Sequence, residues 1–148
     1  MESLTHIASI GQAIQLAVAP VFLLTGVGAT LNVLATRIGR IIDRARVMEN
    51  ALERGTTDFA VEIRNRLVVL STRARWVNRA IVLSVSSGIL VSLVVAALFV
   101  SAVLQVDLAV PIAVAFVLAL LCLAMALLFF LREVFIATES LRFGSKMV

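Results

Sequence analysis

The chain has 148 residues, of which 61% are hydrophobic and 15% are charged, and its formal net charge is +4. Soluble domains average about 45–50% apolar residues, so this composition excludes an ordinary soluble protein and indicates a membrane protein. The single cysteine, Cys122, excludes a framework of disulfides within the chain.

Three apolar runs are each long enough to cross a bilayer as a helix. They cover about residues 13–35, 80–104 and 109–131, and about 20 residues cross ~30 Å of hydrocarbon. The runs lack the alternation of barrel strands, so we predict an all-α fold with three transmembrane helices. The stretch LQVDLAVP at 104–111 predicts a tight turn, with Pro111 in the first turn of the third helix.

The placement of the basic residues predicts the orientation of these helices. Ten of the thirteen lie in residues 37–79 and three follow residue 131, whereas none precedes Arg37. Because basic loops favour the cytoplasm, we expect the N-terminus outside and the C-terminus in the cytoplasm. The absence of a basic residue at the start argues against a cleaved signal peptide.

Residues 37–79 keep a helical period on both sides of one break, which predicts a cytoplasmic helical hairpin, or stalk. Gly55 suits the end of the first arm, and Thr57 or Asp58 suits the start of the second. We expect the apolar stripes of the two arms to pack together. These stripes comprise Ile38, Ile41, Ile42, Ala45, Met48 and Leu52 on the first arm, and Phe59, Ile63, Leu67, Leu70, Ala74 and Val77 on the second.

A second apolar patch on the returning arm requires a second neighbour, either the C-terminal helix or another subunit. It comprises Val61, Val68, Val69 and Trp76. Residues 132–142 predict a cytoplasmic continuation of the third helix, which we expect to end at Gly144. We interpret residues 1–148 as one membrane domain.

A polar and then cationic stripe follows one side of the first helix. At 100° per residue, its members share a face; they are Gln12, Gln15, Gly26, Thr30, Arg37, Arg40 and Arg44. In one interpretation the small residues pack between helices and the arginines anchor at lipid headgroups. In the other, several copies turn the stripe toward a shared axis, and the arginines form a cationic inner vestibule that favours anions.

Local acids offer these arginines partners. Asp43 lies three residues from both Arg40 and Arg46, and Glu62 lies four residues before Arg66. Anions or anionic lipid headgroups at Arg37, Arg40 and Arg44 are the other expected partners. Five acids interleave with the bases of 37–79, so we expect no nucleic-acid binding.

Small residues recur at every fourth position in the second apolar run, at Ser84, Gly88 and Ser92. Such faces let helices approach closely in lipid. Three helices enclose no pore alone, so we expect a homo-oligomer with cyclic symmetry.

The sequence offers no sign of catalysis. The only histidine, His6, lies near the outer end of the first helix, where we expect a surface residue, and no cysteine–histidine set has metal-ligand spacing. We therefore expect no enzyme activity, cofactor or metal.

Between Val18 and Leu52 the sequence resembles a bacterial family of small three-span integral membrane proteins of unknown function. Pro20 and Leu34 carry part of the resemblance, followed by Arg37, Arg40, Ile41, Asp43 and Arg44. It implies a multi-pass protein of the bacterial inner membrane and brings no activity. A looser architectural likeness is to ExbB, TolQ and MotA-type ring proteins, although the third run lacks the carboxylate that proton passage needs.

Two hypotheses follow. The first is a homo-oligomeric ion-conducting pore with a cationic cytoplasmic vestibule. The second is a non-conducting scaffold or accessory subunit whose stalk docks a partner protein.

Overall fold

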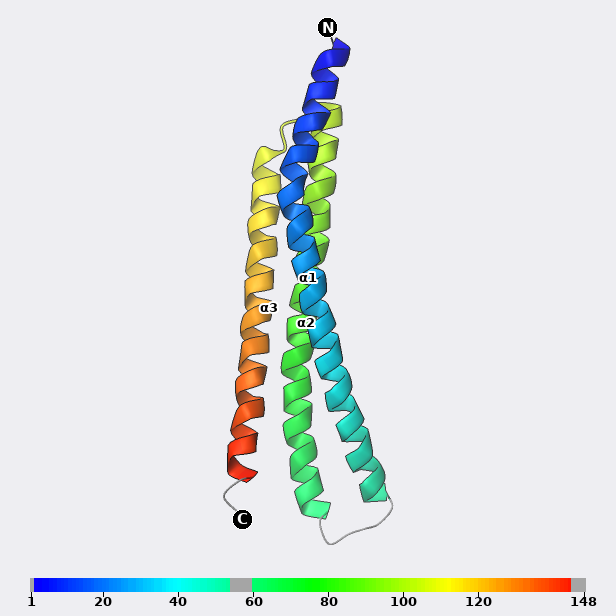
Figure 1. The fold of residues 1–148 in the computed structure, drawn as a ribbon, viewed down its shortest axis with the longest axis vertical. Coiled ribbons are helices and arrows are strands. Elements are labelled where there is room, and N and C mark those ends of the chain that lie inside the picture. The colour runs from blue at the N-terminus through cyan, green and yellow to red at the C-terminus, as the bar shows by residue number, and fades with distance from the viewer. Residues whose placement is uncertain (1, 54–59, 145–148) are drawn as a thin grey trace. The chain divides into compact units, whose positions relative to one another are not determined.

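The residues that the computed structural model describes form three long helices. The structure describes the backbone of residues 2–53 and 60–144 and the side chains of residues 10–53 and 61–135. Helix α1 spans Glu2–Glu53, α2 spans Ala60–Leu104 and α3 spans Ala109–Gly144, coloured in chain order from blue to red in Figure 1. No strand occurs in the described ranges, which confirms the all-α prediction.

Each helix contains a stretch long and apolar enough to cross a membrane, as predicted. These stretches lie within Ile10–Glu53, Val61–Leu104 and Ala109–Phe135. Helix α3 also continues through the predicted range 132–142. The predicted break of the hairpin, from Gly55 to Asp58, and Phe59 of the predicted seam lie outside the described residues.

The chain divides into two compact units, and each draws on all three helices. The first unit combines Met1–Leu31 with Leu83–Ala124, and the second combines Asn32–Val82 with Met125–Val148.

The first unit buries mainly small side chains. Ala13 and Ala17 of α1 and Ala119 of α3 are at most 5% exposed. Ser87 of α2 is fully buried, and its hydroxyl donates to the carbonyl of Ala119 at 2.8 Å. Alanine and serine let helix backbones approach closely, which is how helices gain contacts where the surroundings are as apolar as the side chains.

The predicted turn between α2 and α3 also belongs to the first unit. Gln105 takes a left-handed conformation, with φ of 55°, directly after the last residue of α2. Glycine is the commonest residue in this helix-ending position, so Gln105 adopts it at a steric cost. The Asp107 carboxylate accepts a hydrogen bond from the Ala109 N–H at 3.0 Å, which satisfies one free donor where α3 begins.

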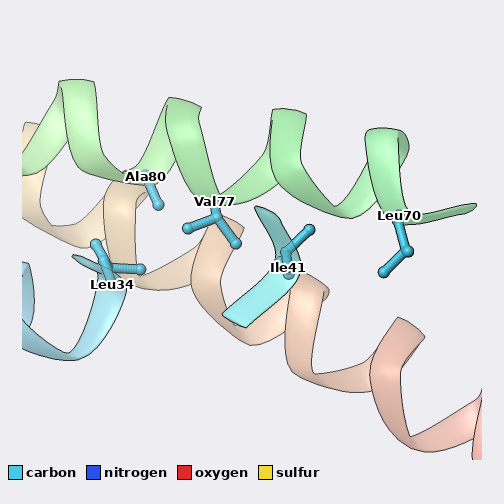
Figure 2. Packing of buried hydrophobic residues seen from close by; sticks show 5 residues of the cluster. All are labelled: Leu34, Ile41, Leu70, Val77 and Ala80. Atoms are coloured by element: carbon cyan, nitrogen blue, oxygen red, sulfur yellow. The ribbon is translucent and has the colours of Figure 1, made fainter. Parts of the chain in front are cut away.

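The second unit has a continuous apolar core. Figure 2 shows Leu34 and Ile41 of α1 facing Val77 and Ala80 of α2, and these four residues with Leu70 are at most 7% exposed. Members of both predicted stripes pack at this core, which confirms the predicted seam of the hairpin; they are Ile38, Ala45, Met48 and Ala74.

One residue that the sequence assigns to the seam, Ile42, is not buried there. Ile42 is 48% exposed, because it lies about 100° around the helix from the buried Ile41. Phe129 and Phe130 of α3 pack against the same core, so the third helix supplies the second neighbour of the returning arm. Trp76 uses this neighbour, because its ring lies 5.5 Å from that of Phe129, whereas Val61, Val68 and Val69 stay exposed.

Candidate functional site

The second unit holds a buried carboxylate that joins two arginines. Glu133 of α3 has no exposed surface, and its Oε2 accepts a hydrogen bond from Arg37 Nη1 of α1 at 2.9 Å. Its Oε1 accepts from Arg73 of α2, from Nε at 3.2 Å and Nη2 at 2.7 Å. Three helices thus meet at one carboxylate, whose two oxygens are both bonded to charged donors.

Arg37 lies in this site, as the sequence predicts, whereas the sequence analysis does not identify Glu133 as its partner or Arg73 as the second donor to Glu133. The expected pairing of Asp43 with Arg40 or Arg46 is not found, whereas Glu62 and Arg66 do pair, at 2.6 Å. A signal for Glu133 did exist in the sequence. It is the first acid after the third apolar run, and Arg37 is the first base after the first run, so both belong to the same boundary.

A cavity of about 240 Å³ opens beside this ion cluster. Four arginines line it against a single acid, and two apolar side chains complete the wall; the lining residues are Arg37, Arg40, Arg44, Arg73, Glu133, Ile41 and Leu70. Arg40 and Arg44 are exposed. Neither has an acid partner within the described part of the chain, so the cavity has an excess of positive charge suited to an anion.

Arg37 also contacts an aromatic ring of α3. The Arg37 guanidinium carbon lies 5.0 Å from the centroid of the Phe130 ring, within the range of a cation–π contact. Glu133 and Phe130 both belong to α3, so this helix supplies both contacts that hold the Arg37 guanidinium in place. Arg37 therefore differs from Arg40 and Arg44, which sequence reasoning had treated as equivalent to it.

The other predicted residues of α1 lie in the first unit and are little covered by their own chain. Gln12, Gln15 and Gly26 are exposed, while Thr30 is half-buried and donates its hydroxyl proton to the Gly26 carbonyl at 2.9 Å. The buried side of α1 here carries Ala13, Ala17 and Val27 instead. The polar stripe thus faces away from the intramolecular contacts of this unit.

The predicted small-residue face of α2 is used within the protomer. A Cβ added at Gly88 would lie 3.5 Å from Val27 Cγ1 and 3.7 Å from Leu24 Cδ1 of α1, so this glycine permits close packing on that helix. Ser84 is fully buried and its hydroxyl has no hydrogen-bond partner. Ser92 is exposed and donates to the Gly88 carbonyl at 2.9 Å.

Potential metal ligands and nucleophiles are few in the described residues. No group of three or more His, Cys, Asp or Glu side chains there could hold a metal ion. Cys122 is a free, half-buried thiol. His6 lies among the residues whose side chains are not described.

Comparison with known proteins places the chain in a family. The family described as "Protein of unknown function (DUF2721)" matches residues 17–143, which include the whole ion cluster, all of α2 and parts of α1 and α3. No curated protein and no solved structure gives a significant match.

Proposed function

The chain belongs to the DUF2721 family, whose function is unknown, and we propose that it forms a homo-oligomeric pore for small anions in a bacterial inner membrane. The observation that carries this proposal is a cavity lined by four arginines and one glutamate, in which two of the arginines, Arg40 and Arg44, are exposed. Rings of positive side chains at a pore mouth concentrate anions and repel cations.

The exposed polar residues of α1 support assembly. Gln12 and Gln15 present side-chain amides that gain nothing from contact with lipid tails. A cyclic oligomer would bring these amides together at one mouth and would bring Arg40 and Arg44 of each copy to the other. This arrangement agrees with the expected orientation, in which the arginine end faces the cytoplasm.

Glu133 separates the arginines of the proposed vestibule into two that are paired and two that are unpaired within the described residues. It bonds Arg37 and Arg73, so their positions are fixed and its single negative charge offsets one of their two positive charges. Arg40 and Arg44 keep their charge available to a passing ion. We therefore expect ion selectivity to depend on Arg40 and Arg44 more than on Arg37.

The test is ion flux through the purified protein in liposomes and planar bilayers. We expect chloride permeation, with a reversal potential in a potassium chloride gradient that indicates anion preference. The double variant Arg40→Glu, Arg44→Glu should lose or reverse this preference, because it replaces the available positive charges by negative ones.

Arg46→Glu is the matched control, since Arg46 is exposed on the same helix and does not line the cavity. It should keep the preference of the wild type. Absence of flux from the wild type, or an unchanged preference in the double variant, would overturn the pore. A monomer in native mass spectrometry from lipid nanodiscs would overturn the assembly.

A second candidate function is a non-conducting scaffold or accessory subunit whose stalk docks a partner protein, and the exposed valines of α2 favour it. Val61, Val68 and Val69 are 77%, 60% and 47% exposed, and they lie in the charged part of the helix before the apolar run. In water such a patch favours a protein partner. Val68→Asp should then abolish capture of that partner from solubilised membranes while leaving flux unchanged. Neither function involves catalysis, and we expect no enzyme activity.

A further inference from the structure

A second arginine cluster in the same unit surrounds the only tryptophan of the chain. The guanidinium carbons of Arg132 and Arg79 lie 4.7 Å and 5.2 Å from the centroid of the Trp76 ring. Phe129 contacts the same ring, with centroids 5.5 Å apart and planes tilted by 44°. The Trp76 ring of α2 thus contacts one arginine from its own helix and one arginine from α3.

Unlike Arg37, Arg66 and Arg73, the two arginines of this cluster have no acid partner among the described residues. Arg73 is bonded to Glu133 and Arg66 to Glu62, whereas no described acid pairs with Arg79 or Arg132. Both are exposed. Stacking on an aromatic face fixes the plane of a guanidinium but leaves the N–H groups at its edge free to donate. The two guanidiniums of the cluster therefore have N–H donors that no residue in the described part of the chain accepts.

The sequence places this cluster at the boundary of the apolar runs. Arg79 directly precedes the run at 80–104, and Arg132 directly follows the run at 109–131. Tryptophan and arginine are enriched at this level, where acyl chains give way to headgroups. Within each apolar run, an exposed aliphatic side chain lies about one helical turn from the arginine. Val82, three residues after Arg79, is 56% exposed, and Leu128, four residues before Arg132, is 55% exposed.

We propose that Arg79 and Arg132, held on Trp76, bind the phosphate of an anionic phospholipid headgroup in the cytoplasmic leaflet. The two guanidiniums donate to the phosphate oxygens, and the acyl chains lie along the aliphatic side chains beyond them. Two positive charges without an acid favour an anionic lipid over a zwitterionic one. The site is complete within one protomer, so it does not depend on the proposed pore or on assembly.

Trp76 makes the site directly measurable. The chain has one tryptophan and no tyrosine, so its intrinsic emission reports this cluster alone. The protein is reconstituted into phosphatidylcholine vesicles that contain increasing fractions of lipid brominated in the acyl chains. The brominated lipid is either phosphatidylglycerol or phosphatidylcholine, and the ratio of the two quenching efficiencies measures the preference of the site for the anionic lipid.

We expect brominated phosphatidylglycerol to quench about fivefold more effectively at low fractions, as attraction of a cationic side chain to an anionic lipid predicts. Arg79→Gln and Arg132→Gln should each lower this ratio, and the double variant should bring it close to one. Arg64→Gln removes the same charge from an exposed position of α2 outside the cluster, and it should leave the ratio unchanged.

A ratio of one in the wild-type protein would overturn the proposal without any variant, so the test does not rely on the variants folding. An unchanged ratio in the double variant would also overturn it. Inorganic phosphate added to pure phosphatidylcholine vesicles distinguishes the source. If phosphate alters Trp76 emission and phosphatidylglycerol does not, the site binds a free anion and the lipid assignment is wrong.

Discussion

The two units of the chain bury different chemistry, although the same three helices build both. The first unit buries alanine, valine and serine, and one of its buried hydroxyls, that of Ser84, is unpaired. The second buries Glu133 beneath two arginines, beside a core of leucine, valine and phenylalanine. We infer that steric fit specifies the contacts of the first unit, whereas ion pairing adds to an apolar core in specifying those of the second.

Removing the charge of Glu133 should give the largest loss of stability. Glu133→Gln keeps the size of the side chain but leaves Arg37 and Arg73 without their acid, and breaking a buried ion pair costs about 3–5 kcal/mol. We expect about 3 kcal/mol, because the Arg37 side chain is 37% exposed and solvent screens part of its charge. Denaturant unfolding of the protein in detergent micelles, followed by circular dichroism, measures the change.

Glu62→Gln is the matched control for this prediction. Glu62 also pairs with an arginine, but its side chain is 54% exposed and that of Arg66 is 64% exposed. Exposed pairs within one helix contribute about 0.3–0.5 kcal/mol. Equal losses from the two variants would refute the claim that the buried pair specifies the second unit.

Enlarging Gly88 should give the next largest effect, in the first unit. Gly88→Leu places a branched side chain against Val27 and Leu24 of α1, and overpacking costs about 1–3 kcal/mol. Gly88→Ala adds only an ordinary contact at 3.5 Å and should be tolerated. Gly28→Leu is the control, because a Cβ there has no neighbour within 4 Å. The same unfolding measurement applies, and a larger loss at Gly28 than at Gly88 would contradict the packing described here.

Two buried serines of the first unit should give the smallest effects, with a difference between them. Ser87→Ala loses the hydrogen bond to the Ala119 carbonyl, which contributes about 0.6 kcal/mol between helices in membranes. Ser84→Ala removes an unpaired buried hydroxyl, so it should leave stability unchanged or raise it by up to about 1 kcal/mol. A stability loss at Ser84 as large as that at Ser87 would mean that the Ser84 hydroxyl has a partner in the membrane.

The helices themselves could be predicted from sequence because they depend on local properties. Run length and hydropathy predict three spans, the polar stretch at 104–111 predicts the turn, and spacings of three and four residues predict the seam that contains Ile41 and Val77. Charge placement predicts that the arginines gather where the apolar runs end. All of these features are fixed within one helix and its immediate neighbours in the chain.

The partners across helices were decided by tertiary structure. Helical periodicity defines the faces of each helix but not which side chain of another helix lies opposite at the same level. For that reason Glu133 was not foreseen as the partner of Arg37, 96 residues away, nor Ser87 as the donor to Ala119. The same limit applies to Arg79 and Arg132, which are 53 positions apart in the sequence and contact one ring because α3 lies against Trp76 of α2.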